Sequence, residues 1–298
     1  MLNGMINVYK EAGFTSHDVV AKLRGICGQK KIGHTGTLDP EAVGVLPVCL
    51  GSGTKLCDML ADRDKEYVAE LLLGVRTDTQ DTTGQILEER EVTASKEEVK
   101  VAILGFQGQY DQVPPMYSAL KVNGKKLYEL ARAGKEVERQ PRPVTIHEIE
   151  ILDMQLPKVT IRVACSKGTY IRTLCDDIGR SLGCGGAMAS LKRTRVGEFG
   201  IEDALTLGQL QDLRDQGRLE SCVRDVDACF QNCPALHVAE EHRKLIDNGN
   251  SFYPSQTLEN RKYGEDRWVR VYNSENRFYG IYAYEEARHW YKPVKMFL

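Results

Sequence analysis

Two apolar stretches separated by a short gap, at about residues 144–152 and 158–165, constrain the fold more than any other feature of the sequence. A gap this short joins antiparallel strands, whereas parallel strands need a crossover of about a dozen residues or more. The stretches therefore predict a hairpin, and a helix is expected after it, from about Thr169 to Leu182. The order of strand, helix, hairpin and helix predicts an α/β fold of the α+β kind. Its sheet is expected to be mixed, largely antiparallel and flanked by helices, which argues against repeated βα units.

Further elements are predicted from apolar periodicity and from helix-capping residues. Ser16 is expected to cap a helix that ends near Cys27. The segments 95–98 and 206–209 each begin with Ser or Thr and have Glu or Gln three residues later, which is the spacing of a capping box. Strands are expected at about residues 5–9, 44–50, 67–73 and 187–196, and helices at about 16–27, 95–104 and 206–215.

The chain is expected to form two domains, because its 298 residues exceed the ~150 residues of a typical domain. The pattern changes near Cys233-Pro234, where a β-rich segment begins. We therefore expect an α/β domain over residues 1–232 and a small β-rich domain over residues 233–298. In the second domain a helix is expected at about 239–248, with strands at about 267–272, 278–284 and 290–297.

Three features predict a cytoplasmic protein. No run of residues approaches the ~20 apolar residues of a membrane helix, so no membrane association is expected. The N-terminal segment MLNGMINVYKEAGF lacks the basic start and apolar core of a secretory signal. The nine cysteines are odd in number and include no CxxC pair, which fits a reducing compartment better than a disulfide scaffold.

Positive charge is concentrated in three segments, although the formal net charge is −2. Residues 19–38 contain four basic side chains and no acid, residues 115–143 contain seven basic and three acidic ones, and residues 192–195 are Lys-Arg-Thr-Arg. Such clusters can form a footprint for a polyanion. Solvated faces balanced by acids elsewhere are the simpler explanation from charge alone.

Residues 111–143 are predicted to form a long insertion, a type of segment that is usually functional or mobile. Prolines lie near both edges, and a short helical pattern occupies about residues 127–131. The basic side chains expected to contact a polyanionic partner are Lys121, Lys125, Lys126 and Arg132.

The segment 31–44, with the sequence KIGHTGTLDPEAVG, is the most informative for chemistry. Its glycines let the backbone approach a ligand closely, and Pro40 defines a turn that carries Asp39. An Asp-Pro turn alone is usually structural. A rigid loop that holds both the Asp39 carboxylate and His34 beside basic residues is less easily explained as structural only, and it is a candidate functional site.

Other patterns point to chemistry more weakly. Residues 51–55 lack the spacing of a phosphate-binding loop. A Cys/His cluster over residues 229–242 lacks the ~12-residue spacing between the Cys and His pairs of a zinc finger. The carboxylates of residues 77–84 suit either Mg²⁺ or an Asx turn, and the turn is the commoner arrangement. No metal site is therefore predicted.

Several of these segments together resemble the motifs of the TruB family of tRNA pseudouridine synthases. Residues 33–48 resemble the motif around the family's catalytic aspartate, which corresponds to Asp39. Further segments resemble family motifs in the same order along residues 3–200: Lys10 with 13–16, 65–67, 74–84, 166–174 and 191–197. The last 65 or so residues loosely resemble the family's RNA-binding PUA domain.

The resemblance implies a pseudouridine synthase fold and the isomerisation of uridine to pseudouridine at position 55, in the T-loop of tRNA. The N1–C1′ bond breaks, the uracil turns, and C5 bonds to C1′. Because this involves no redox change and no group transfer, no cofactor is expected. Asp39 is expected to add to C1′, to add to C6 or to remove the 2′ proton, and these alternatives stay open.

The resemblance also implies roles for other side chains. Tyr67 is expected to stack on the flipped base and to accept the C5 proton. Arg172 is expected to pair with Asp39, with a surface pair to Asp176 on the same helix as the alternative. His34 is expected to occupy the gap left by the extruded nucleotide. The remaining residues expected to contact substrate are Lys10, Tyr170 and Leu191.

The expected partner is the T-arm of tRNA. Flipping the target uridine costs a few kcal/mol, and the insertion 111–143 is expected to close over the RNA and offset part of this cost. A comparable insertion occurs in family members that act without a guide RNA, so stand-alone action is expected, and the enzyme is expected to be a monomer. The C-terminal aromatic residues are expected to form that domain's core, with stacking on an RNA end as the alternative.

Other classes of function stay open. An RNA-binding or tRNA-folding module without catalysis would use the basic clusters, but would not need Asp39, Tyr67 and Arg172 together. A guide-RNA-dependent synthase in a larger complex is disfavoured by the insertion. A metal-dependent hydrolase would rest only on residues 77–84 and 229–242.

Overall fold

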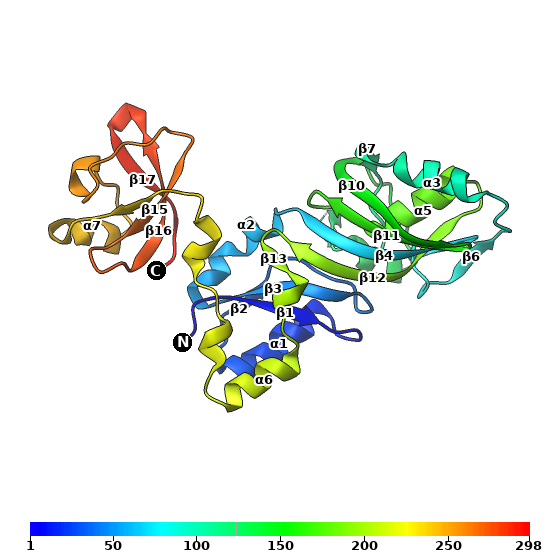
Figure 1. The fold of residues 1–298 in the computed structure, drawn as a ribbon, viewed down its shortest axis with the longest axis horizontal. Helices are drawn as coiled ribbons and strands as arrows, with labels where there is room; N and C mark the ends of the chain where they lie inside the picture. The colour runs from blue at the N-terminus through cyan, green and yellow to red at the C-terminus, as the bar shows by residue number, and fades with distance from the viewer. Residues whose placement is uncertain (123) are drawn as a thin grey trace.

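A nine-stranded sheet runs through the larger part of the molecule (Figure 1). Its main path consists of β1 (Gly4–Lys10), β3 (Val43–Leu50), β12 (Gly186–Val196), β4 (Lys65–Leu73), β11 (Lys158–Cys165), β10 (Arg142–Gln155) and β7 (Gly108–Gln112), while β2 (Ile32–His34) pairs with β3 and β13 (Phe199–Gly200) pairs with β12. The computed structural model describes residues 1–122 and 124–298. Within them, paired strands of this sheet are antiparallel except for β3 and β12, which run parallel. The predicted mixed, largely antiparallel α/β sheet is confirmed, as is the β10–β11 hairpin.

Helices pack on the sheet and divide its apolar residues between several cores. The helices of the larger part are α1 (Ser16–Cys27), α2 (Cys57–Ala61), α3 (Lys96–Leu104), α5 (Ile171–Ser181) and α6 (Leu207–Asp215). One core lies between α3, α5 and strands β4, β10, β11 and β12, with Leu71, Ile161 and Leu174 fully buried. Another joins α1 and α6 to β1 and β3. The long β4 and β12 strands connect the two halves, and the site described below lies along them.

The helix N-termini follow their capping residues closely. Capping boxes are present at Ser95 before α3 and at Thr206 before α6, as predicted. The cap of α1, however, is Thr15, which exchanges hydrogen bonds with Asp18, and the expectation that Ser16 caps this helix is wrong. Ser16 is the first helical residue, and its buried hydroxyl accepts a hydrogen bond of 3.0 Å from the backbone N–H of Leu38. The side chain thus connects α1 to the loop that carries Asp39.

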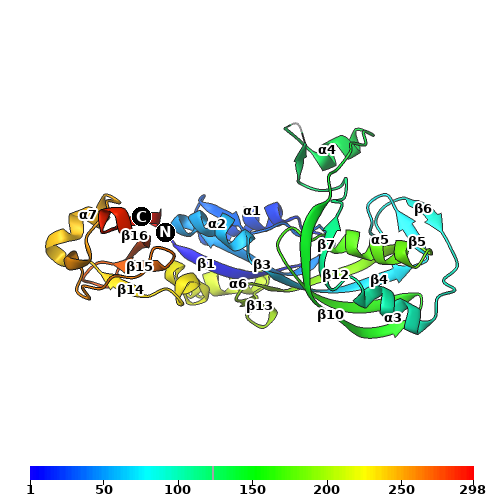
Figure 2. The ribbon, with the colours of Figure 1, turned by 90° about the horizontal axis from the view of Figure 1, so that it is seen from above.

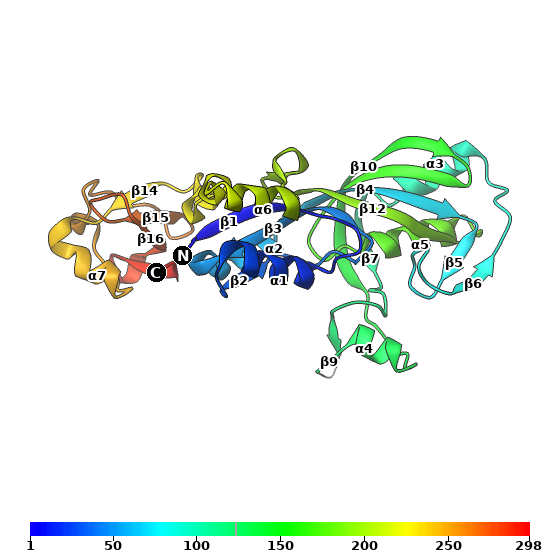
Figure 3. The ribbon, with the colours of Figure 1, turned by 90° about the horizontal axis from the view of Figure 1, so that it is seen from below.

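The predicted insertion is shorter than expected, because its two ends belong to the sheet. Residues 111–112 lie in β7 and residues 142–143 lie in β10, which pair with each other, so the projecting segment spans 113–141. It contains β8 (Lys121–Val122), β9 (Lys125–Lys126) and α4 (Leu127–Arg132), and residue 123 lies outside the described residues. Figures 2 and 3 show α4 standing off the body of the molecule. A second small hairpin, β5 (Val75–Thr77) with β6 (Ile86–Glu89), lies at the far end of β4.

The C-terminal part forms its own four-stranded sheet at one end of the molecule (Figure 1). Its strands are β14 (Ala235–His237), β15 (Trp268–Tyr272), β16 (Phe278–Glu285) and β17 (Trp290–Met296). The helix expected at 239–248 is instead a 3-10 turn followed by the short helix α7 (Arg243–Asp247). Tyr279, Tyr282 and Tyr291 are fully buried and form part of the core of the small domain, as expected, whereas Trp268, one of the aromatic residues expected there, is 40% exposed.

The small domain packs against the large sheet through apolar contacts. Phe230, Ile281 and Phe297 share a buried cluster with Met5 and Val45 of β1 and β3. The short 3-10 helices of the chain span Gly51–Leu56, Ile201–Asp203, Leu219–Cys222, Val226–Phe230, Glu240–His242, Pro254–Gln256 and Glu286–Arg288. Across the described ranges, no helix is long and apolar enough to cross a membrane.

Candidate active site

A cavity of about 640 Å³ opens between the loop after β2, the strands β4 and β12, the start of α5 and the projecting segment 113–141. The predicted site residues that line it are Asp39, Tyr67, Arg132, Tyr170, Arg172 and Leu191. The first and last of these residues, Asp39 and Leu191, are 152 positions apart in the chain. The sheet order brings them together, because β4 and β12 are neighbours and β12 also pairs with β3, which follows the Asp39 loop.

The loop that carries Asp39 is held on both sides of that residue. On one side, the Leu38 N–H donates to Ser16. On the other, the ammonium group of Lys10 donates to the carbonyls of Pro40 at 2.9 Å and Ala42 at 2.6 Å. A loop fixed at both neighbours of Asp39 holds its carboxylate in one orientation, as catalysis by a positioned group requires.

Lys10 does not face the cavity as a substrate-contacting side chain would. Its side chain is fully buried, and its ammonium also donates to the carbonyl of Glu11 at 3.0 Å, so all three N–H donors have backbone partners. Burial lowers the pKa of Lys10 to about 8. The expected substrate contact is therefore not available to Lys10, which positions the loop from behind.

Arg172 makes the central electrostatic contact of the cavity. Its Nε lies 3.0 Å from Asp39 Oδ2, and its Nη2 lies 3.3 Å from Asp39 Oδ1, so the pair is bidentate. The same guanidinium donates to the carbonyls of Thr79 at 3.1 Å and Tyr117 at 2.9 Å. Burial raises the pKa of Asp39, and the neighbouring Arg172 opposes that rise. The arginine thus favours the ionised carboxylate inside a partly desolvated site.

The alternative pairing of Arg172 with Asp176 is wrong. Arg172 is 6% exposed and points into the cavity, away from the surface of α5. Asp176 is itself buried and accepts instead from Arg180 at 2.7 Å and from Gln80 at 3.3 Å.

Asp81 is a second carboxylate that sequence reasoning did not assign to this site. The segment 77–84 forms the expected Asx-type turn, in which Asp81 accepts from the Thr83 N–H at 3.0 Å and from the Thr79 hydroxyl at 2.7 Å. The turn places Asp81 Oδ2 3.7 Å from Nη1 of Arg172. Arg172 is 91 positions further along the chain, so no local pattern signals this contact.

Tyr67 and Leu191 form a wall of the cavity on adjacent strands. Tyr67 faces Arg193 across the β4–β12 pair, and Leu191 faces Ala69 two residues further on, so their side chains share one face of the sheet. Tyr67 is 8% and Leu191 9% exposed. Burial raises the pKa of the Tyr67 hydroxyl. The two side chains therefore give this wall of the cavity one aromatic and one aliphatic residue, the kind of surface on which a nucleobase packs.

Tyr170 and His34 lie at the edges of the cavity. Tyr170 immediately precedes α5, and its backbone is fixed by Gln112, which accepts from the Tyr170 N–H at 2.8 Å and donates to its carbonyl at 3.1 Å. His34 ends β2 and lies one residue outside the segment that lines the cavity. Its Nδ1 accepts from the Gly36 N–H at 3.3 Å, and its ring meets that of His17 edge-on at 5.4 Å. Burial lowers the pKa of His34.

The four basic residues predicted on the insertion differ in their distance from the cavity. Arg132 lines the cavity, and both Arg132 and Lys126 lie over the ring of Tyr128, at 5.5 and 5.3 Å from its centre. Lys121 and Lys125 are exposed on the outer hairpin. The segment thus presents positive charge from the mouth of the cavity outward.

Arg193 and Lys65 are cavity residues that sequence reasoning missed. Arg193 belongs to the basic run 192–195, which suggests a surface cluster, but it is 2% exposed. Lys65 is also buried, and its ammonium donates to the carbonyls of Ala61 and Arg63, both at 2.6 Å. Strand alternation was the available signal for Arg193, since Leu191 and Arg193 point to the same face.

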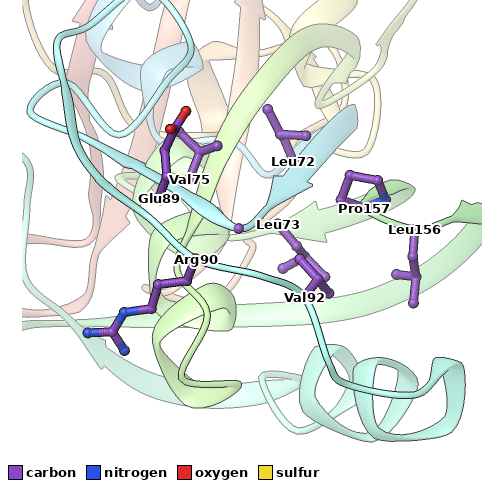
Figure 4. A pocket seen from close by; sticks show the side chains of 9 residues that line it. Leu72, Leu73, Val75, Glu89, Arg90, Val92, Leu156 and Pro157 are labelled. Atoms are coloured by element: carbon purple, nitrogen blue, oxygen red, sulfur yellow. The ribbon is translucent and has the colours of Figure 1, made fainter.

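The other patterns noted in the sequence have structural explanations. Residues 51–55 lie in a 3-10 helix. Within the described residues, no group of three or more His, Cys, Asp or Glu side chains is arranged to hold a metal ion. In the 229–242 cluster, His237 pairs with Glu259 and stacks on Tyr272. A second cavity, of about 450 Å³, lies at the opposite end of β4 and is lined mainly by apolar residues such as Leu72, and it holds none of the predicted site residues (Figure 4).

Comparisons with known proteins agree with this geometry. Residues 24–171 match the N-terminal domain of TruB family pseudouridylate synthases, and residues 172–231 match the tRNA pseudouridylate synthase B C-terminal domain. The tRNA pseudouridine synthase B of Lachnoclostridium phytofermentans is 53% identical over 100% of both chains. The protein of that name from Alkaliphilus oremlandii is 46% identical over 99% of this chain and 97% of its own.

Solved structures show the same fold. An H/ACA ribonucleoprotein bound to a substrate RNA containing 2′-deoxyuridine includes a chain that matches with a TM-score of 0.72 and 23% identity, over 99% of this chain and 85% of that one. A Cbf5–Nop10–Gar1 complex includes one with a TM-score of 0.73 and 25% identity, over 99% of this chain and 85% of that one.

Proposed function

Because the chain belongs to the TruB family of pseudouridylate synthases, we propose that it isomerises uridine to pseudouridine at position 55 in the T-loop of tRNA. One observation carries the proposal. The carboxylate of Asp39 lies in a cavity of about 640 Å³, is paired bidentately with Arg172, and shares that cavity with the side chains of Tyr67 and Leu191.

The cavity suits a single flipped nucleotide. A base in a folded loop has to leave its stack to reach an enclosed carboxylate, and enzymes that act on bases hold the extruded base between aromatic and apolar side chains. Tyr67 and Leu191 supply such a surface, and Tyr170 closes the edge. His34, next to the cavity, is placed to fill the gap that the nucleotide leaves.

Asp39 is the reactive group in this proposal. Its ionised form is required whether it adds to C1′, adds to C6 or removes the 2′ proton, and Arg172 favours that form. Tyr67, which lines the same cavity, is the group proposed to take the C5 proton after the new bond forms. The isomerisation involves no net oxidation or reduction. In this proposal the side chains of the cavity supply the nucleophile or base and the proton acceptor that the reaction needs.

The projecting segment 113–141 supports action on free tRNA without a guide RNA. Arg132 at the cavity and the exposed Lys121 and Lys125 provide phosphate contacts beside the target base. One copy of the chain brings Asp39, Tyr67 and Arg172 into one cavity, and a monomer is the proposed active unit. Because the proposed substrate is tRNA, a cytoplasmic location is proposed for the enzyme. The small C-terminal domain, which we assign as PUA-like, lies beyond the cavity and is proposed to bind RNA.

The experiment is release of tritium from a T-arm RNA transcribed with [5-³H]uridine, with EDTA present and no other RNA. The wild-type protein is expected to release the label from the T-loop uridine, and mapping of the product locates the modified position. Asp39→Asn is expected to release none while binding the RNA within about twofold of wild type, because the change is isosteric. Binding without turnover by the wild-type protein would instead indicate a tRNA-folding module, and turnover by Asp39→Asn would exclude Asp39 as the reactive group.

A further inference from the structure

Arg193 is one of the largest fully buried side chains of the molecule, although it is charged and lies in a basic run. Burying a guanidinium costs free energy unless its donors are satisfied. The cost is increased here by two other enclosed cations, Lys10 and Lys65: burial is the main cause of their lowered pKa values, and the charge of Arg193 lowers both further. An apolar side chain at position 193 would fill the same space without this repulsion, so the charge of Arg193 itself calls for an explanation.

The backbone of Arg193 occupies the junction of three strands. It pairs with Gly44 of β3 on one side and with Tyr67 of β4 on the other. The approach to β3 is close, since a Cβ atom on Gly44 would lie 2.2 Å from the Arg193 carbonyl oxygen, and Gly44 has a φ of 106°. Only glycine suits that position. Arg193 is therefore fixed between the strand that follows the Asp39 loop and the strand that carries Tyr67.

The side chain of Arg193 reaches the Asp39 loop and the strand that follows it. Its Nε donates to the carbonyl of Val45 at 2.7 Å, and its Nη2 donates to the carbonyl of Gly36, three residues before Asp39, at 3.4 Å. Tyr67 is the cross-strand neighbour of Arg193 and lines the same cavity. Burial raises the pKa of Tyr67, and the charge of Arg193 opposes that rise. One planar group thus holds the Asp39 loop from a position beside Tyr67.

We infer that Arg193 is a positioning residue for the isomerisation: it holds the Asp39 loop in a fixed relation to Tyr67 on the neighbouring strand β4. This inference rests on the proposed function. Arg193 is distinct from Arg172, which contacts the carboxylate itself, and from Lys10, which holds the other side of the loop. The guanidinium acts on the reaction through the Asp39 loop.

The test compares Arg193→Gln and Arg193→Lys with a matched control, Arg162→Gln. Arg162 lies on β11, keeps 41% of its side chain exposed and pairs with Glu150 away from the cavity. Single-turnover tritium release is measured at saturating T-arm RNA, and the RNA dissociation constant is measured separately. Arg193→Gln is expected to lower the rate constant about 30-fold, which is typical for loss of a charge-assisted hydrogen bond, with RNA affinity within about twofold of wild type. Arg193→Lys keeps the charge and is expected to recover part of the rate, and Arg162→Gln is expected to match wild type.

The outcomes separate the possible roles. Equal rates for Arg193→Gln and Arg162→Gln would overturn the inference. A parallel loss of rate and RNA affinity in Arg193→Gln would make Arg193 a binding residue. Folding of both Arg193 variants is checked by circular dichroism and thermal unfolding. If neither variant folds, Arg193 has only a structural role, which would also overturn the inference. An inactive wild-type protein would reject the proposed isomerisation itself.

Discussion

Replacing Arg172 by Met removes the charge that faces Asp39 while keeping a side chain of similar length. The magnitude follows from the two hydrogen bonds to the carboxylate, at 3.0 and 3.3 Å. A charge-assisted hydrogen bond contributes about 1.5–3 kcal/mol. Because 39% of the Asp39 side chain is exposed, water partly replaces the lost bonds, and the lower end of that range applies. Two bonds at ~1.5 kcal/mol give ~3 kcal/mol, which corresponds to a rate about 150-fold lower.

The assay is single-turnover tritium release from T-arm RNA at saturating protein, measured across pH for wild type and Arg172→Met. Burial raises the pKa of Asp39 and Arg172 lowers it, so loss of the arginine raises that pKa further. The reaction needs the ionised carboxylate, and its rate therefore rises with pH through this pKa. The rising limb is expected to move to higher pH in Arg172→Met.

The matched control is Arg180→Met, on the same helix. Arg180 is 55% exposed and pairs with Asp176, so its loss is expected to leave both the rate and the pH profile unchanged. A rate for Arg172→Met within about threefold of wild type, with the limb in its original place, would refute the assignment of Arg172 as the partner of Asp39.

Three further changes test other parts of the site. Tyr67→Phe keeps the stacking surface and loses the hydroxyl, so RNA binding and glycosidic cleavage are expected to survive. Product formation, measured by nucleoside chromatography, is expected to stop. Wild-type kinetics in this variant would show that Tyr67 acts only as a stacking surface. Lys10→Met leaves buried carbonyls without donors, so it is expected to lower the free energy of unfolding by about 2–4 kcal/mol, measured in urea. Turnover by this variant is expected to fall at least tenfold. An unchanged unfolding midpoint would contradict the positioning role of Lys10. Simultaneous substitution by Ala on the projecting segment is expected to weaken tRNA binding and to lower the log–log salt slope by roughly 1 for each lost phosphate contact, with little effect on the saturated rate. The four residues changed are Lys121, Lys125, Lys126 and Arg132. The same segment is expected to be cut by protease in the free protein and protected by tRNA, and an unchanged salt slope with equal protease resistance in both states would reject the clamp.

Local features of the fold were predictable from sequence because they depend on residues three or four positions apart. The capping boxes before α3 and α6 are of this kind, as is the Asx turn at residues 77–84. The β10–β11 hairpin follows from the short gap between two apolar stretches. Asp39 was identifiable because the segment around it is continuous in sequence: Gly, Thr and Pro indicate a defined turn there, and residues 33–48 resemble the family's motif around its catalytic aspartate.

Tertiary structure alone decided which charged side chains face the cavity and which are enclosed behind it. Arg172 pairs with Asp39, 133 positions away, and not with Asp176 on its own helix, because strand order places the start of α5 opposite the loop. Lys10 looks like a substrate contact in the sequence, yet backbone carbonyls use all of its donors. Arg193 belongs to a basic run but is enclosed where β3, β12 and β4 meet. A local pattern records the type of a charge, whereas its burial and its partner depend on how distant strands pair.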